Sequence, residues 1–428
     1  MTNVNNDTTI SVKKRMSRKE IVILIMYVFV FLLLTFTPFS MILGMDNIII
    51  SYSIVAIILV YSSRDYIKTT FFKLTLIYFV VLLLNYFLES LVNLGNILSE
   101  SFSIFAAGFM FYYGIKQDPK GLFTKVLMYT FCIITVIYAY RTYSIERGWP
   151  GIMRHAASQL NYERVAYLFA SGLSPYAFPH ALTCVLPAFM LGIKINKKWK
   201  GKIFYIIMLG ASTLLIYVTQ STGALIVAVF ALVCSFIVHI GSWKENATKI
   251  IVFSLLITPI IVSDTMKMAI LDTMEATISA DSHYQKKIEE LKSSINSYQD
   301  NVEEGGDIEY RGNLLGMTLS AIAKSPLVGV SNRSYGNHNA LLDRWAEYGL
   351  VGFIPIVMFI YLMVKFTMQF IPDPYRTFYI IGVLSNLLMM LSKSMFGWYQ
   401  WICFLFFLPL MIRFIVYTTK SKKNVQLV

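Results

Sequence analysis

Long uninterrupted apolar runs constrain this chain more than any other feature of its sequence. They lie at residues 21–37, 41–61, 71–88, 102–115, 122–140, 176–193, 203–218, 224–240, 250–262, 350–370, 378–391 and 398–417. Runs of this length cross a bilayer as helices, and their continuity excludes the alternating pattern of a membrane β-barrel. Because lipid leaves only helices and closed barrels as spanning structures, the sequence predicts an all-α, polytopic integral membrane protein of about 12 transmembrane helices.

The composition agrees with a membrane protein. Hydrophobic residues make up 56% of the 428 residues and charged residues only 14%, which leaves too little polar surface for a soluble domain. The run at 21–37 follows five basic residues and precedes no small-residue cleavage site, so we expect a retained first span rather than a signal peptide. The four cysteines all fall inside apolar runs, which implies neither a disulfide nor a metal site: Cys132, Cys184, Cys234 and Cys403.

Basic residues are distributed unequally between the two sides of the predicted topology. Of the 37 Lys and Arg residues, 24 fall on the side that holds the N-terminus and 13 on the other. The positive-inside rule therefore predicts cytoplasmic termini and an outward-facing loop before residue 349, and the net charge of +13 implies no nucleic-acid partner. Among the 13 outward residues, seven are arginines, whose guanidinium suits phosphate or carboxylate: Arg141, Arg147, Arg154, Arg164, Arg311, Arg333 and Arg344.

The predicted spans divide the chain into three parts. Residues 1–262 form an N-terminal membrane domain of about nine helices, 263–348 a large extracytoplasmic loop, and 349–428 the C-terminal membrane helices with a cytoplasmic tail. Loops as long as 263–348 are usually functional or disordered. We expect this one to be partly helical, with Gly305-Gly306 ending one helix before a second helical segment that follows Arg311.

The end of this loop carries the most informative motif. His338-Asn339 is followed by nine residues and then by Gly349 and Gly352 at the start of an apolar run. Upstream, Arg311 precedes a helix-like segment that ends in Ser-Pro-Leu-Val-Gly-Val at 325–330. Together these residues resemble the Wzy-like family of O-antigen ligases and of O-antigen and capsular polysaccharide polymerases. Family members often carry Ser-Arg-Gly where this chain has Ser-Thr-Gly at 221–223, so another arginine would have to supply that contact.

The resemblance implies a GT-C-like membrane glycosyltransferase whose donor is an undecaprenyl-pyrophosphate-linked oligosaccharide. His338 would be the general base on the acceptor hydroxyl, with Glu347 as a second catalytic residue. Attack with inversion would release undecaprenyl pyrophosphate, and arginines would neutralise its charge without a metal ion or another cofactor. The expected pyrophosphate- or glycan-binding residues are Arg311, Arg333, Arg344, Asn339, Arg147 and Arg154.

Each of these residues also has a purely structural interpretation. His338 can pack within the loop, and Asn339 can be the N-cap of the following helix. Glu347 can hold His338 or an arginine in place, or lie in the first turn of a helix, where an acidic side chain is favoured. The remaining alternatives are ion pairs of Arg311 or Arg333 with Glu309 or Glu347, and close helix packing at Gly349 and Gly352.

Three functions fit this pattern. A ligase transfers finished polysaccharide to lipid A core and therefore requires an outer membrane. The Ile-, Asn-, Lys- and Phe-rich composition indicates an AT-rich genome and favours a Gram-positive host that makes capsule or exopolysaccharide, so a polymerase is favoured over a ligase. A flippase for the same lipid-linked units would carry its charges within the spans, whereas the arginines here lie in outward loops. The implied setting is the outer face of the bacterial cytoplasmic membrane, with membrane lipids, a flippase and a chain-length regulator as partners.

Overall fold

Every regular element in the described part of the chain is a helix. The computed structural model describes residues 64–88, 122–149, 176–219, 221–242, 244–250, 264–277, 307–330, 339–392 and 398–420, together with isolated positions elsewhere. For these residues the predicted all-α class is confirmed. The helices are α4 (Arg64–Ile67), α5 (Thr70–Leu88), α7 (Leu122–Gly148), α10 (Ala177–Leu182), α11 (Leu186–Ile195), α12 (Trp199–Val218), α13 (Thr222–Ile237), α15 (Asp264–Thr277), α17 (Asp307–Lys324), α18 (Ala340–Phe370), η1 (Asp373–Tyr375), α19 (Arg376–Ser392), α20 (Trp398–Trp401), η2 (Ile402–Phe407) and α21 (Leu408–Lys420).

Four helical stretches of the described part are long and apolar enough to cross a membrane: Thr124–Gly148, Trp199–Val218, Ala340–Phe370 and Tyr399–Val416. Shorter apolar helices cover Thr70–Leu84, Leu186–Ile195, Gly223–Ile237 and Leu314–Lys324. All of these except the last coincide with apolar runs of the sequence. The predicted runs at 21–37, 41–61, 102–115 and 250–262 lie wholly or partly outside the described residues, so a total of about 12 spans stays a prediction.

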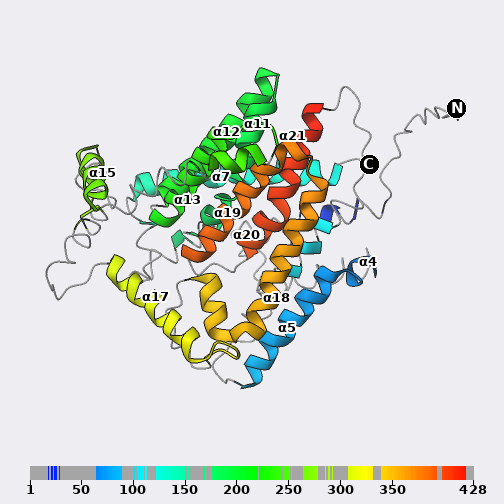
Figure 1. Cartoon of the computed structure of the whole chain (residues 1–428). Helices are drawn as coiled ribbons and strands as arrows, with labels where there is room; N and C mark the ends of the chain where they lie inside the picture. Colours follow the sequence, from blue (N-terminus) through cyan, green and yellow to red (C-terminus); the bar gives the residue numbers. More distant parts are fainter. Residues whose placement is uncertain are drawn as a thin grey trace.

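The apolar helices pack side by side into a bundle (Figure 1). Helix α18 lies along α5, α12 lies along α7 and α11, and α13 lies along α19. Two glycines bring neighbouring helices close together. A Cβ on Gly192 would lie 2.5 Å from Cγ of Tyr205 in α12, and a Cβ on Gly352 would lie 3.0 Å from Cγ1 of Val81 in α5. The structural interpretation of Gly352 as a close-packing residue is therefore confirmed.

Helix α18 begins ten residues before the apolar run that predicted it. The run starts at Leu350, whereas the helix starts at Ala340 and contains one break, at Gly349 (φ 59°, ψ −169°). Figure 1 shows the two parts of α18 as the arms of a V that meet at this break. The first part carries Asp343, Arg344 and Glu347, so hydropathy alone assigned it to the loop.

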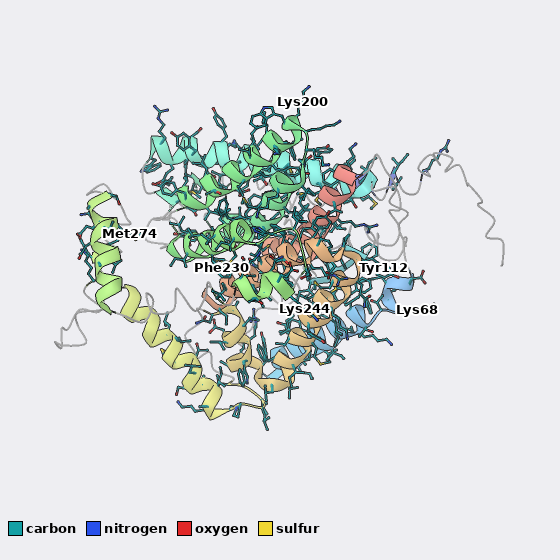
Figure 2. All side chains as sticks on the ribbon, turned by 45° about the horizontal axis from the view of Figure 1, so that its top comes forward. Lys68, Tyr112, Lys200, Phe230, Lys244 and Met274 are labelled. Atoms are coloured by element: carbon teal, nitrogen blue, oxygen red, sulfur yellow. The ribbon has the colours of Figure 1, made fainter. Side chains whose placement is uncertain are left out.

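Helices α15 and α17 lie beside the bundle rather than within it (Figures 1 and 2). Both belong to the range 263–348, which is therefore partly helical, as expected. Figure 2 labels Met274 on α15, at the edge of the molecule away from the bundle. Lys292 forms ion pairs with Asp272 of α15, at 2.5 Å, and with Glu275, and its hydrogen bonds to these carboxylates raise the pKa of Lys292. This arrangement gives α15 the charged surface of a helix in water.

The backbone that follows α17 is hydrogen-bonded to the break in α18. We name the contacts between residues 326–330 and residues 346–351 the clasp. The N–H groups of Leu350 and Val351 donate to the carbonyl oxygens of Pro326 (2.9 Å) and Leu327 (3.3 Å). In the opposite direction, the N–H of Val330 donates to the carbonyl oxygen of Ala346 at 2.8 Å. The break leaves these groups without their helical partners, and the clasp supplies new ones.

The clasp requires a glycine in each of its two backbone segments. Gly329 (φ 87°) and Gly349 (φ 59°) both adopt the left-handed region, which disfavours residues with a side chain. A Cβ on Gly349 would lie 2.2 Å from the carbonyl oxygen of Leu327, and a Cβ on Gly329 would lie 2.3 Å from that of Glu347. Since both obstacles are backbone atoms, no side-chain rearrangement can relieve the overlap.

Replacement of Gly349 by alanine is expected to break the clasp. The left-handed conformation and the overlap with Leu327 should together cost about 2 kcal/mol or more, and thermal unfolding of the purified protein in detergent should begin at a clearly lower temperature. Gly316→Ala is the matched control, because a Cβ at that exposed position of α17 meets nothing within 4 Å. It should leave the melting temperature unchanged or raise it slightly. Equal melting temperatures for the two variants would contradict the role assigned to Gly349.

Candidate functional site

The candidate site lies on the pair formed by α17 and the first part of α18. The two helices meet through Ala321 and Ile322 of α17 and Ala346 of α18, with Trp345 packed against them. The indole N–H of Trp345 also donates to the carbonyl oxygen of Pro326 at 3.1 Å, which joins this small apolar cluster to the clasp. The clasp and the cluster therefore fix how α18 is seated on α17.

The packing of α18 on α17 places two of the predicted site residues, Arg311 and Asn339, at the same end of the helix pair. Thr318 of α17 is hydrogen-bonded to Asp343 of α18. Arg311 precedes Thr318 by seven residues, or about 10 Å of helix, and Asn339 precedes Asp343 by four residues, or about 6 Å. Both therefore lie beyond the Thr318–Asp343 contact, on the side away from the clasp.

Asp343 is a buried acidic residue that joins the two helices of this pair. Its side chain is only 4% exposed, and its Oδ1 accepts a hydrogen bond from the Thr318 hydroxyl at 3.0 Å. Its Oδ2 accepts a hydrogen bond from the backbone N–H of Asn339 at 2.6 Å. A buried carboxylate with two donors ties the start of α18 to α17, directly after the predicted catalytic position.

Asn339 occupies the N-cap position of α18, as one of its two interpretations required. Its φ and ψ of −123° and 102° are those of an extended residue before a helix, yet its side chain makes no capping hydrogen bond. The Asp343 carboxylate satisfies the backbone N–H of Asn339 instead. The Asn339 side chain therefore does not cap the helix and stays a candidate for contact with a glycan.

Arg344 and Glu347 form an ion pair within the first part of α18. The Nη1 of Arg344 donates to Oε2 of Glu347 at 2.6 Å and to the hydroxyl of Tyr348 at 3.4 Å. The guanidinium also lies 5.5 Å from the centre of the Tyr348 ring, and Glu347 is only 8% exposed. Glu347 therefore holds an arginine, Arg344, as one of its interpretations required, whereas its catalytic role stays a prediction.

The other predicted site residues are not joined to this pair by any described contact. Arg147 is exposed in the last turn of α7, a helix that packs on α12 and α21. The side chain of Arg311 is not among the described ones, although its backbone is part of α17. His338, Arg333 and Arg154 lie outside the described residues. Their roles stay predictions from the sequence.

A second polar contact joins α10 to the start of α13. Nε2 of His180 lies 2.7 Å from the hydroxyl of Ser221, and both side chains are buried. The ring of Tyr176 stacks on His180, with centroids 5.2 Å apart and planes 5° apart. Ser221 is the first residue of the Ser-Thr-Gly segment that departs from the family pattern. The contact spans 41 residues of sequence and could not be read from local spacing.

Sequence reasoning also missed Asp343 and Thr318. An acidic residue in the first turn is a recognised signal for the start of a helix. The role of Asp343 could therefore have been predicted if the helix start had been placed at Ala340. Thr318 had no comparable signal, because only the packing of α17 on α18 brings it to the carboxylate. Among the described residues, no group of three His, Cys, Asp or Glu side chains is arranged to hold a metal ion.

Comparison with known proteins finds a family match that covers the helices of this site. Residues 203–357 match the O-antigen ligase family. The matched range begins in α12 and ends in the second part of α18, so it contains α17, the clasp, Asp343 and the motif that ends at Gly352. The resemblance found at 311–353 is thereby confirmed and extended towards the N-terminus. No curated protein matches the chain.

The O-antigen ligase match sets the general character of the protein. It indicates a membrane enzyme of the glycosyltransferase kind that acts on lipid-linked oligosaccharides, in agreement with the apolar helices of the bundle. The site that this family match covers is the helix pair at α17 and α18, where arginine, carboxylate and amide groups gather at the start of an apolar helix.

Asp343→Asn is expected to loosen the start of α18. An amide lacks the charge that strengthens both hydrogen bonds and can accept only one of them. The Thr318 hydroxyl, which also donates to the carbonyl oxygen of Leu314 at 3.2 Å, would have to become an acceptor, so the change should cost about 1–2 kcal/mol locally. Amide hydrogen exchange of peptides covering residues 339–348 should therefore become faster. Asp373→Asn is the control, since it removes only the exposed pair with Arg376 and should leave those peptides unchanged. Unaltered protection of 339–348 in Asp343→Asn would refute this anchoring role.

Proposed function

We propose that this protein is a polysaccharide polymerase that joins undecaprenyl-pyrophosphate-linked oligosaccharide repeat units on the outer face of the cytoplasmic membrane. The observation that carries the proposal is the O-antigen ligase match, because it includes both Arg311 and the motif from His338 to Gly352. The packing of α17 on the first part of α18 supports it further, since it brings the start of the motif and the arginine-bearing helix to one end of a single helix pair.

The proposed reaction is a metal-independent transfer with inversion. His338 takes the proton of the acceptor hydroxyl as that oxygen attacks the anomeric carbon of the donor. The new bond joins the anomeric carbon to the acceptor oxygen, and the bond to the phosphate oxygen breaks. The electron pair leaves with undecaprenyl pyrophosphate, whose charge is balanced by Arg311 and Arg333.

The described residues would support this reaction by positioning. Asp343 holds the backbone of Asn339, the residue next to the proposed base, through its bond to that N–H group. Glu347 orients Arg344 rather than exchanging a proton with substrate, because its carboxylate already accepts a short hydrogen bond from that guanidinium. Arg147, at the end of α7, and Arg154, in the segment that follows it, would contribute in place of the arginine missing from the Ser-Thr-Gly segment at 221–223.

The proposed orientation follows from the lysine and arginine count. Both termini lie in the cytoplasm, and the range 263–348 lies outside, where a nucleotide sugar is absent and a lipid-linked donor is present. The helix pair then meets its substrate at the membrane surface. A flippase that delivers the repeat units and a regulator of chain length are the partners such an enzyme needs.

The proposal is tested by the glycans of cells that carry His338→Ala. The gene is deleted and complemented with wild type, His338→Ala or His239→Ala at equal membrane expression, and lipid-linked and surface glycans are separated on a gel. His239→Ala is the control because this exposed histidine follows α13 and its described hydrogen bonds use only its backbone. Wild type and His239→Ala should give ladders of many repeat units, and His338→Ala should give single units only.

The same gel separates the alternatives. A complete ladder from His338→Ala would remove the general base from the mechanism. Polymer that forms in the deletion strain but stays on its undecaprenyl carrier would identify a ligase. Loss of single units from the outer face in the deletion strain would instead identify a flippase.

A further inference from the structure

Exposed apolar residues follow one side of α17 and the turn after it. The turn is the most exposed part, with Leu327 at 62% and Val328 at 71% exposure. Leu315 and Leu319 are both exposed and lie one turn apart on the same side of α17. We name these four residues the lipid-facing strip: Leu315, Leu319, Leu327 and Val328. Four large apolar side chains in one exposed strip are more than a water-facing helix normally carries.

The composition of α17 excludes an ordinary amphipathic helix in water. The helix already buries Thr318, Ala321 and Ile322 on the side that faces α18. The opposite side would then be expected to carry charge, yet residues 312–323 contain no charged side chain. Both sides of the helix are therefore built for apolar or uncharged surroundings.

The clasp joins this strip to a surface that already belongs to the membrane. The N–H groups of Leu350 and Val351 bind the carbonyl oxygens of Pro326 and Leu327, so the turn lies level with the first residues of an apolar span. Val351 itself is 61% exposed. Exposed apolar residues continue down the same helix at Ile354, Val357, Met358 and Tyr361.

The length of that span indicates that the lipid extends as far as the turn. From Leu350 to Val364 the second part of α18 has no charged residue, and this stretch rises only about 22 Å. The hydrocarbon core of a bilayer is about 30 Å thick. The apolar layer therefore reaches at least to the break at Gly349, where Leu327 and Val328 are held.

We propose that the lipid-facing strip is inserted in the bilayer, in the leaflet at the Gly349 end of α18. The occupant of this surface is membrane lipid, because the strip is continuous with the lipid-exposed side of the span and carries no charge that would match a polar partner. The helix pair is then anchored at two points, by the second part of α18 and by the strip. The inference does not depend on the reaction proposed above or on which leaflet is the outer one.

Spin labels on single introduced cysteines test this placement. Leu315→Cys, Leu319→Cys and Val328→Cys report on the strip, Val351→Cys is the reference for lipid, and Met274→Cys on the charged helix α15 is the reference for water. All five replace exposed side chains, so packing is left intact, and wild type measures background labelling of the four buried cysteines. The full chain is reconstituted in vesicles of dioleoylphosphatidylcholine and dioleoylphosphatidylglycerol.

The measured quantity is the ratio of collision rates with oxygen, which concentrates in lipid, and with a water-soluble nickel chelate. The ratio at residues 315, 319 and 328 is expected to be close to that at residue 351 and several-fold above that at residue 274. A ratio equal to that at Met274 would place the strip in water and overturn the proposal. Protection from both reagents would also overturn it, since it would mean that protein, such as a second copy of the chain, covers the strip.

Discussion

The candidate site depends on the backbone hydrogen bonds of the clasp. A helix that breaks at Gly349 has unpaired carbonyl oxygens before the break and unpaired N–H groups after it. In an apolar environment such groups cannot be left without partners. The turn after α17 satisfies both kinds at once, with Val330 as donor and with Pro326 and Leu327 as acceptors. The break and the turn are therefore each stable only in the presence of the other.

This mutual requirement positions the rest of the helix pair. With the clasp in place, the first part of α18 can pack on α17 only in the register that joins Ala346 to Ala321 and Ile322. The same register brings Thr318 to Asp343, and Asp343 in turn holds the N–H of Asn339. A backbone contact at one end of the pair thus orders the backbone at the other end, where the motif begins.

The sequence predicted the helices better than it predicted their interruptions. Apolar runs located α5, α12, α13 and α19 closely, because lipid selects apolar residues directly. They placed the start of α18 at Leu350 because Asp343, Arg344 and Glu347 lower the hydropathy of a part that is nonetheless helical. A helix that continues across a left-handed glycine has no signature in periodicity. The Gly-x-x-Gly motif marked the right position, but close helix packing explains only Gly352.

The candidate site was predictable where its contacts are local and not where they are distant. The pairing of Arg344 with Glu347 was one of several open possibilities, since residues three apart on a helix face each other. Asp343 was missed together with the helix start that would have revealed its role. The contacts of Thr318 with Asp343 and of His180 with Ser221 join residues 25 and 41 positions apart, so only the tertiary structure could supply them.

The physical setting of the helix pair explains why a lipid-linked substrate suits it. A polyprenyl-linked donor brings its pyrophosphate to the membrane surface and no further, so a protein that uses it needs cations and a base at that depth. The two parts of α18 form a V with its tip at Gly349, and the first part turns back beside α17 instead of continuing away from the span (Figure 1). The charged residues 343, 344 and 347 are thereby kept next to the apolar helices. A straight α18 would instead carry them about 3–9 Å beyond Gly349, away from a substrate that cannot leave the bilayer.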